Sequence, residues 1–296
     1  MTGDGPLVRV RLDLAYDGTA FAGWARQAGG LRTVQGVLEE ALAVATGRAP
    51  GSEPRLVVAG RTDAGVHATG QVAHVDLTQA QLAALVRRHD GVQDVGRIAD
   101  RLTGMLAADG DVVVHDAAIA PPGFDARFSA VHRRYRYRIA DTIAARDPLQ
   151  RTRTLWHSRS LELELLRAAA EPMTGLHDFA AYCRPRPGAT TIRTLQSFSW
   201  ERDAAGVLVA DVQADAFCHG MVRSLVGAAL AVGTARLPPE RMGQLLAADG
   251  RTGEFATAPA HGLTLVEVAY PQGAELAAQA ERARARRESI DPLPMG

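Results

Sequence analysis

Residues 60–67 read Gly-Arg-Thr-Asp-Ala-Gly-Val-His and gather a carboxylate, a guanidinium and an imidazole in one short loop with two glycines. An apolar run precedes this loop at 56–59, and a run rich in β-formers follows it at 71–77. Asp63 is therefore predicted on a tight turn between two strands, where a rigid scaffold presents reactive groups. A solvated turn aspartate beside a solvated Arg61 is the alternative that the loop alone leaves open.

The composition is that of a globular protein with a sizeable core. The chain has 296 residues, of which 47% are apolar and 22% charged, so two linked domains are expected. No apolar stretch approaches the ~20 residues of a membrane span, and residues 1–5 lack the features of an export signal. Cys183 and Cys218 match no paired metal-ligand spacing, which favours a reducing, cytoplasmic location.

Basic residues are of one kind and are unevenly placed. All 33 are arginine, which excludes a Schiff-base lysine and a P-loop lysine. The net charge is zero, yet the segment 126–159 holds nine arginines against Asp141 and Asp147, so it carries +7 and the remainder −7. Such clustering predicts binding of a polyanion; a solvated charged face is the alternative. The nine are Arg127, Arg133, Arg134, Arg136, Arg138, Arg146, Arg151, Arg153 and Arg159.

Hydrophobic periodicity predicts an α+β protein. Strands are expected at 8–16, 56–59, 72–77, 112–120, 133–139, 195–202, 207–215 and 263–270. Helices are expected at 34–45, 79–88, 161–173, 221–232, 239–247 and 274–287. We divide the chain into an N-terminal half at 1–130 with the Asp63 loop, a C-terminal half at 131–272, and a charged tail at 273–296. Each half mixes antiparallel strands with helices.

Arg223 is the only formally charged residue from 216 to 235, within a helix that is apolar on nearly every side. A guanidinium in such surroundings needs a carboxylate partner, and Asp63 is the candidate. That pair would keep the aspartate ionised, as a nucleophile or base at neutral pH. A structural ion pair with another acidic residue is the alternative.

Tyr135 and Tyr137 alternate with Arg134, Arg136 and Arg138 on a predicted strand. Rings on one face and guanidinium groups on the other suit a flipped or single-stranded base, with stacking on one side and phosphate contact on the other. Ordinary core tyrosines are the alternative. The sequence shows no zinc-ligand spacing, no Gly-x-Ser-x-Gly elbow and no dinucleotide-binding glycine loop, so no metal and no cofactor is expected.

Seven blocks between about residues 8 and 271 resemble the tRNA pseudouridine synthase A family in order and spacing. They are Tyr16-Asp17-Gly18-Thr19-x-Phe21-x-Gly23-Trp24, Thr33-Val34-Gln35-Gly36-x-Leu38-Glu39, residues 60–67 with Gly70-Gln71-Val72, Phe124-Asp125-Ala126-Arg127-Phe128-Ser129-Ala130, Arg134-Tyr135-Arg136-Tyr137, Ala216-Phe217-x-His219-x-Met221-Val222-Arg223, and Ala258-Pro259-x-x-Gly262-Leu263.

The resemblance implies an enzyme that isomerises uridine to pseudouridine at positions 38, 39 and 40 of the tRNA anticodon stem-loop, without metal or cofactor. Asp63 matches the family's catalytic nucleophile, and Arg223 matches the arginine that pairs with it. Tyr135 matches the tyrosine that stacks on the target base. Other residues expected to line the substrate pocket are Arg61, His67, Leu263 and Leu265. Those expected on the RNA backbone are Arg127, Arg133, Arg134 and Arg136.

The resemblance also implies a cytoplasmic homodimer, with two similar α+β halves around a central cleft in each protomer and tRNA touching both protomers. A covalent route through the aspartate and a glycal route through deprotonation of C2′ both remain open. The sequence departs from the family at 25–27, where only one glutamine follows the tryptophan, and at 87–110, which is longer and lacks a Leu-Pro pair. These differences bear on local loop shape and not on the proposed catalytic positions.

Two other classes of protein remain as alternatives. A non-catalytic RNA-binding protein could keep this scaffold, although the presence of Asp63 disfavours it. A nucleoside hydrolase could use the same aspartate, and it would release free base.

Overall fold

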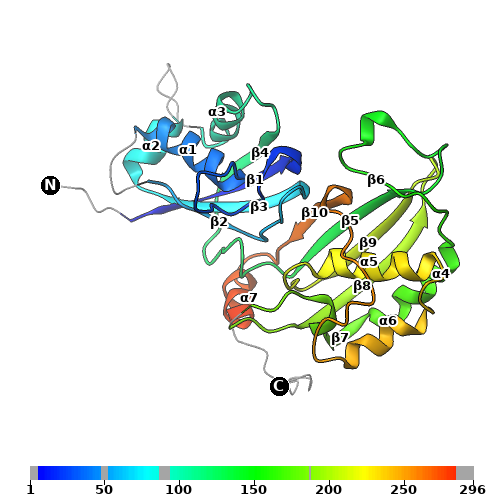
Figure 1. The fold of residues 1–296 in the computed structure, drawn as a ribbon. Coiled ribbons are helices and arrows are strands. Elements are labelled where there is room, and N and C mark those ends of the chain that lie inside the picture. The colour runs from blue at the N-terminus through cyan, green and yellow to red at the C-terminus, as the bar shows by residue number, and fades with distance from the viewer. Residues whose placement is uncertain (1–5, 48–52, 87–93, 187, 285–296) are drawn as a thin grey trace. The chain divides into compact units, whose positions relative to one another are not determined.

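The structure, a computed structural model, describes residues 6–47, 53–86, 94–186 and 188–284. Parts of the helix expected at 79–88, of the longer region at 87–110 and of the tail at 273–296 lie outside these residues. The described chain forms two compact units, drawn in Figure 1. Unit 1 contains residues up to Val131 together with Leu265–Arg284, and unit 2 contains His132–Thr264.

Unit 1 is built on a sheet in the order β4-β1-β3-β10, with β2 paired to β3. Its strands are β1 (Val8–Tyr16), β2 (Leu56–Val58), β3 (His67–Leu77), β4 (Val112–Ile119) and β10 (Leu263–Ala269). The β1–β3, β1–β4 and β2–β3 pairs are antiparallel. In β1, buried residues alternate with half-buried ones, and Val10 and Leu12 are opposite Val75 and Ala73 of β3. All four are fully buried, so this register sets the core of unit 1.

Three helices of unit 1, α1 (Val34–Thr46), α2 (Gln79–Val86) and α3 (Arg97–Met105), lie together on one side of its sheet (Figure 1). Thr33 begins α1, because its side chain accepts a hydrogen bond from the Gly36 backbone N–H, as a helix N-cap does. The helix ends where Gly47 adopts the left-handed conformation.

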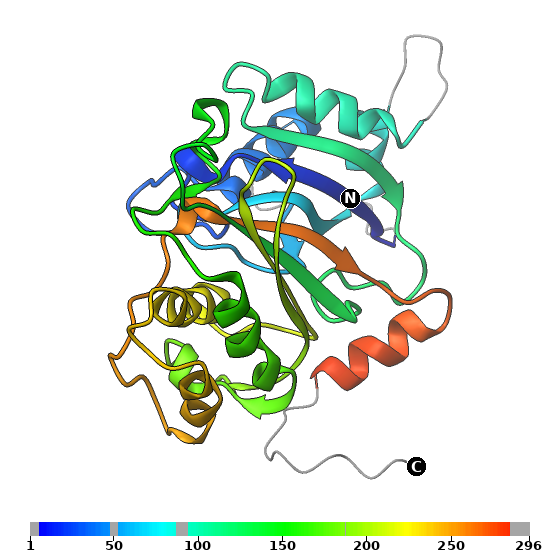
Figure 2. The same cartoon turned by 90° about the vertical axis from the view of Figure 1, so that its right-hand side faces the viewer.

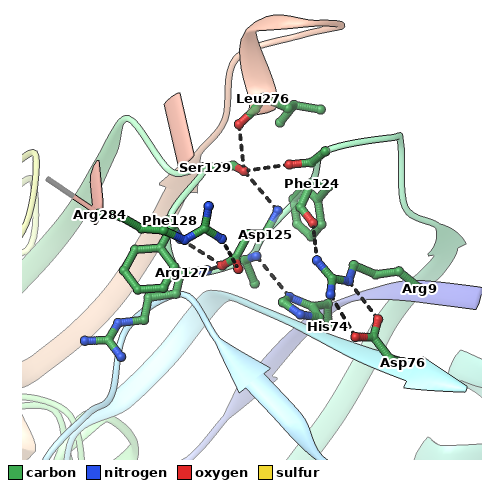
Figure 3. A network of polar contacts seen from close by, with 12 residues as sticks. Arg9, His74, Asp76, Phe124, Asp125, Arg127, Phe128, Ser129, Leu276 and Arg284 are labelled. Atoms are coloured by element: carbon green, nitrogen blue, oxygen red, sulfur yellow. Dashed lines mark hydrogen bonds and ion pairs between the residues drawn. The ribbon is translucent and has the colours of Figure 1, made fainter. Parts of the chain in front are cut away.

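A fourth helix, α7 (Glu275–Arg284), packs on the segment 121–130 of the same unit. Leu276 and Ala280 are buried, and the Ser129 hydroxyl donates to the Leu276 carbonyl at 3.0 Å. Figure 3 shows how Arg284 reaches Asp125, at 3.3 Å, across the Phe128 ring. The division expected from the sequence placed this helix in a separate charged tail. The apolar face of α7, which carries Leu276 and Ala280, joins it to unit 1 instead.

The sheet strands of unit 2 follow the order β5-β9-β8-β7, with the short β6 parallel to β5. They are β5 (His132–Ala140), β6 (Leu155–Trp156), β7 (Gly175–Asp178), β8 (Ile192–Arg202) and β9 (Leu208–Ala214). The other pairs are antiparallel. Helices α4 (Leu163–Ala170), α5 (Met221–Gly233) and α6 (Glu240–Gln244) gather on one side of this sheet (Figures 1 and 2).

Short 3-10 turns complete the two units, at Gly18–Ala20, Pro148–Gln150, Glu171–Met173, Ala180–Tyr182, Leu245–Ala247 and Ala260–Gly262. With helices and mainly antiparallel strands in each unit, the predicted α+β class is confirmed.

The two cysteines, which are far apart in the sequence, lie close together in unit 2. The Cα atoms of Cys183 and Cys218 are 5.8 Å apart. A backbone hydrogen bond from Arg184 N to His219 O, at 2.9 Å, holds the two segments side by side. The sequence separation of 35 between the cysteines concealed this proximity.

Candidate active site

Asp63 lies in the loop between β2 and β3, as predicted, and its side chain is half-buried. The backbone of this loop is bound to the segment 17–24. Trp24 N donates to Thr62 O at 3.0 Å, and Gly65 N donates to Phe21 O at 3.3 Å. Two sequence blocks that are about 40 residues apart therefore form one local structure that fixes the backbone on both sides of Asp63.

A buried side-chain network also holds the loop that carries Asp63. The Tyr16 hydroxyl lies 2.8 Å from Thr62 Oγ1, and Gln71 Nε2 donates to the Tyr16 hydroxyl at 3.1 Å and to Gly60 O at 2.8 Å. Burial raises the pKa of Tyr16 to about 12, so the hydroxyl keeps its proton at neutral pH. Gln71 donates to the Tyr16 hydroxyl, and in the contact between Tyr16 and Thr62 either hydroxyl can be the donor.

Gly18 makes the closest approach to the loop. A Cβ atom at Gly18 would lie 2.1 Å from the Val66 carbonyl oxygen, so only glycine fits. The Gly18 backbone N–H donates to His67 Nδ1 at 3.0 Å. Asp17 Oδ1 also lies 3.2 Å from that nitrogen. His67 Nδ1 therefore lies between the Gly18 backbone N–H and the Asp17 carboxylate.

Asp17 is bound on its other side by Thr19. Burial of Asp17 disfavours its charged form, but hydrogen bonds from the Thr19 backbone and hydroxyl outweigh this and hold the pKa of Asp17 below its usual range. His67 is buried, whereas the Arg61 side chain is exposed beside Asp63. His67 thus braces the loop, and Arg61 faces solvent.

Tyr135 and Tyr137 of β5 are buried, and the arginines that alternate with them are half-buried, as the predicted two-faced strand requires. The Tyr135 ring meets the Phe217 ring edge-on, with 5.2 Å between the centroids. The Tyr137 hydroxyl donates to Pro259 O at 2.8 Å, and burial raises the pKa of Tyr137 well above its usual range. Tyr137 is therefore a core residue.

Arg223 lies in the first turn of α5 and is half-buried. Its Nε donates to Ala258 O at 2.8 Å, and Ala258 N donates back to Arg223 O at 2.9 Å. These bonds fix the side chain against the segment 256–259 of unit 2. Asp63 belongs to unit 1, and its pairing with Arg223 stays a prediction. Of the predicted pocket leucines, Leu263 and Leu265 are both buried in β10.

The four arginines expected on the RNA backbone differ in their surroundings. Arg127 is exposed and Arg134 is half-buried. Arg133 is buried and donates to Asp215 O at 2.7 Å. Arg136 pairs with Asp211 of β9 at 2.9 Å, and this hydrogen-bonded carboxylate raises the pKa of Arg136. The side chains of Arg133 and Arg136 are thus already hydrogen-bonded to other groups of the protein.

Sequence reasoning missed several residues that shape the site: Tyr16, Gly18, Gln71, Phe217 and Ala258. Most lie within the matched blocks, but their residue types alone carry no catalytic signal. Only the pairing of β1 with β3 brings Tyr16 and Gln71 to Thr62. Within the part of the chain that the structure describes, no group of three or more histidine, cysteine or acidic residues is arranged to hold a metal ion, and no helix is long and apolar enough to cross a membrane.

Several known proteins are similar to this chain in sequence. A family profile described as tRNA pseudouridine synthase matches residues 169–271. A protein of Leifsonia xyli subsp. xyli named tRNA pseudouridine synthase A is 57% identical over 94% of this chain and 97% of its own length. Proteins of the same name from Frankia casuarinae and Streptomyces griseus subsp. griseus are each 54% identical, over 98% and 94% of this chain and 98% and 93% of their own lengths. The chain belongs to the tRNA pseudouridine synthase A family of isomerases.

Proposed function

We propose that this protein isomerises uridine to pseudouridine at positions 38, 39 and 40 of the tRNA anticodon stem-loop, with Asp63 as the reacting carboxylate. Family membership supports the chemistry, and the positions follow from the motif resemblance. One observation carries the assignment of Asp63: two backbone hydrogen bonds and a buried side-chain network hold its loop on both sides. A group so held is preorganised for reaction.

The reaction is balanced without a cofactor. The N1–C1′ glycosidic bond breaks, the base turns, and a C5–C1′ bond forms; the proton lost from C5 is matched by one gained at N1. Asp63 either attacks the sugar covalently or deprotonates C2′ on a glycal route. The target uridine must first leave the stack, at a cost of a few kcal/mol.

Residues of both units supply the remaining roles in this proposal. Tyr135 stacks on the flipped uracil, and its edge-on contact with Phe217 fixes the ring. Arg223, oriented by Ala258, pairs with Asp63 and keeps it ionised. Leu263 and Leu265 form the apolar wall, and exposed Arg61 reaches the RNA. His67 acts by bracing the loop.

Backbone contacts are proposed for Arg127, Arg133, Arg134 and Arg136. Arg127 is exposed, and Arg133 and Arg136 also bind protein groups. A cytoplasmic homodimer that holds one tRNA across two protomers completes the proposal.

The direct test uses total tRNA from a strain that lacks this protein. After incubation with purified enzyme, chemical labelling should map new pseudouridines to positions 38, 39 and 40, and transcripts with cytidine there should gain none. Pseudouridine elsewhere only would contradict the proposed positions. Chromatography of the same mixture for free uracil separates isomerisation from hydrolysis, since release of stoichiometric uracil would establish a hydrolase.

A further inference from the structure

A basic pocket lies in unit 2, outside the residues assigned to catalysis. Its volume is about 380 Å³. It is lined by two arginines, Arg159 and Arg236, by His157, and by the hydroxyl residues Ser158, Thr234 and Thr257. The remaining lining residues are small or apolar, and no carboxylate is among them. The pocket therefore gathers positive charge and polar groups around one hollow, in which the Thr234 hydroxyl donates to Leu230 O at 2.8 Å and the Thr257 hydroxyl accepts from Arg251 at 2.9 Å.

Some guanidinium groups of the unit are neutralised by a carboxylate. Arg202 pairs with Asp141, and Arg241 pairs with Glu254. For Arg159 and Arg236, the structure shows no ion pair within residues 6–47, 53–86, 94–186 and 188–284. Two unneutralised cations beside the same hollow favour an anion between them. The planar guanidinium group suits the oxygens of a phosphate.

The pocket adjoins the face of helix α5 that carries Arg223. Gly227, Leu230 and Thr234 line the pocket. Starting at Arg223, the successive spacings are four, three and four residues, so Gly227 and Leu230 share the Arg223 face of α5 and Thr234 follows at its C-cap. Gly227 and Leu230 lie about 6–10 Å along the axis from Arg223. A Cβ at Gly227 would lie 1.9 Å from the Ala256 carbonyl oxygen, so α5 is pressed against the segment 256–259.

The segment 256–259 contacts the Arg223 side chain and also lines the pocket. Ala258 binds the Arg223 side chain, and Ala256, Thr257, Ala258 and Pro259 form one wall of the pocket. We propose that this pocket is a subsite for a backbone phosphodiester of the RNA strand that carries the target uridine, a few nucleotides away from it. The inference rests on the proposed function, because it takes tRNA as the substrate and Arg223 as a marker of the reacting centre. The phosphate anchors the strand while the base is turned out.

The test removes both arginines in the double variant Arg159→Ala/Arg236→Ala. Both side chains are exposed, so the fold should persist. The matched control, Arg167→Ala/Arg282→Ala, removes two exposed arginines of weak surface pairs outside the pocket. We expect the pocket variant to raise the KM for tRNA about tenfold at moderate salt, with kcat within about threefold of wild type. The slope of log binding constant against log salt should fall by about 2, one for each lost phosphate contact.

A second measurement identifies the phosphate. Anticodon stem-loop RNAs with one neutral methylphosphonate at successive positions should bind wild type more weakly at one or two positions near the target. The pocket variant should be insensitive at those positions and otherwise normal. Equal KM values and salt slopes for the pocket and control variants, or no position that distinguishes pocket variant from wild type, would overturn the subsite. Absence of pseudouridine formation by wild type would instead refute the proposed function.

Discussion

The Asp63 loop, residues 60–67, and the distal arginine segment, residues 142–160, hold their functional groups in opposite ways. In the loop, buried bonds from Tyr16, Gln71 and the segment 17–24 fix the backbone around one carboxylate. In the distal segment, Ile143 and Leu149 are each 84% exposed, and the arginines bond mainly to nearby backbone or amide groups. The loop depends on exact placement, and the segment depends on accumulated charge. Single substitutions should therefore have large effects on function in the loop and small effects in the segment.

The largest effect of these is expected for Gly18→Ala. The added Cβ would overlap the Val66 carbonyl and push the loop away from its support. A displacement of about 1 Å at a reacting group can lower the rate about 100-fold, so kcat should fall by that order. The control is Gly104→Ala in α3, where a Cβ meets nothing within 4 Å. Equal kcat values for the two variants would show that the loop tolerates movement.

A large effect on stability is expected for Asp141→Asn, in the arginine-rich part of unit 2. Asp141 is buried, pairs with Arg202 at 2.8 Å and accepts from Leu161 N at 2.9 Å. Burial disfavours its charge, but these bonds outweigh it and hold the pKa of Asp141 below its usual range. The substitution should lower the free energy of unfolding at pH 7 by about 3 kcal/mol.

The same residue predicts a pH dependence. Since the folded pKa of Asp141 is depressed, its stabilisation is complete above the unfolded value of about 4 and is lost as pH falls through the folded value. The difference between wild type and Asp141→Asn, measured by urea unfolding, should shrink below about pH 4. Asp147→Asn is the control, because asparagine can still accept from Leu149 N. A gap that persists unchanged at low pH would contradict this account.

A smaller effect is expected for Tyr16→Phe, which leaves Thr62 and Gln71 without the hydroxyl between them. The loss of a buried hydrogen bond costs about 1 kcal/mol, which corresponds to a fall in kcat of about fivefold if it loosens the loop. Tyr270→Phe removes a comparable bond, to Ala126 O at 2.7 Å, away from the Asp63 loop. It should lower the midpoint of thermal unfolding but leave kcat unchanged. If both variants lost stability and neither lost kcat, the role of Tyr16 would be structural only.

The smallest effects are expected for single arginines. Within the described part of the chain, the Arg153 side chain bonds to the amide oxygen of Gln150, whereas Arg136 pairs with the Asp211 carboxylate. Arg153→Ala should reduce the salt slope of tRNA binding by about 1. Arg136→Ala should change the slope less, because its charge is already balanced. Filter binding at several salt concentrations measures both, and equal changes in slope would remove the distinction between paired and unpaired arginines.

Much of this fold follows from sequence pattern alone. Alternation predicted β1 and β5, the Thr33 cap predicted the start of α1, and the glycine-rich run predicted a turn at Asp63 between two strands. Strand β7 and helix α3 were missed, because four half-buried residues carry no period and the polar region around 97–105 shows little apolar signal.

The candidate site was predictable only in part. Asp63, Tyr135 and Arg223 stand out by chemistry and by the family blocks. The residues that hold them in place do not stand out in the sequence. The Tyr16–Thr62 contact depends on strand register, and the pairing of Arg136 with Asp211 depends on which strand lies next to β5. Long-range pairing of this kind cannot be read from local periodicity.

Asp63→Asn is the most direct test of the account, since it removes the negative charge while keeping the shape of the side chain. Single-turnover formation of pseudouridine should be compared with wild type and with Asp109→Asn, a largely exposed aspartate of the same unit. The account predicts no product from Asp63→Asn, tRNA affinity within about threefold of wild type, and full activity from Asp109→Asn. Product formation by Asp63→Asn at the wild-type rate would contradict it.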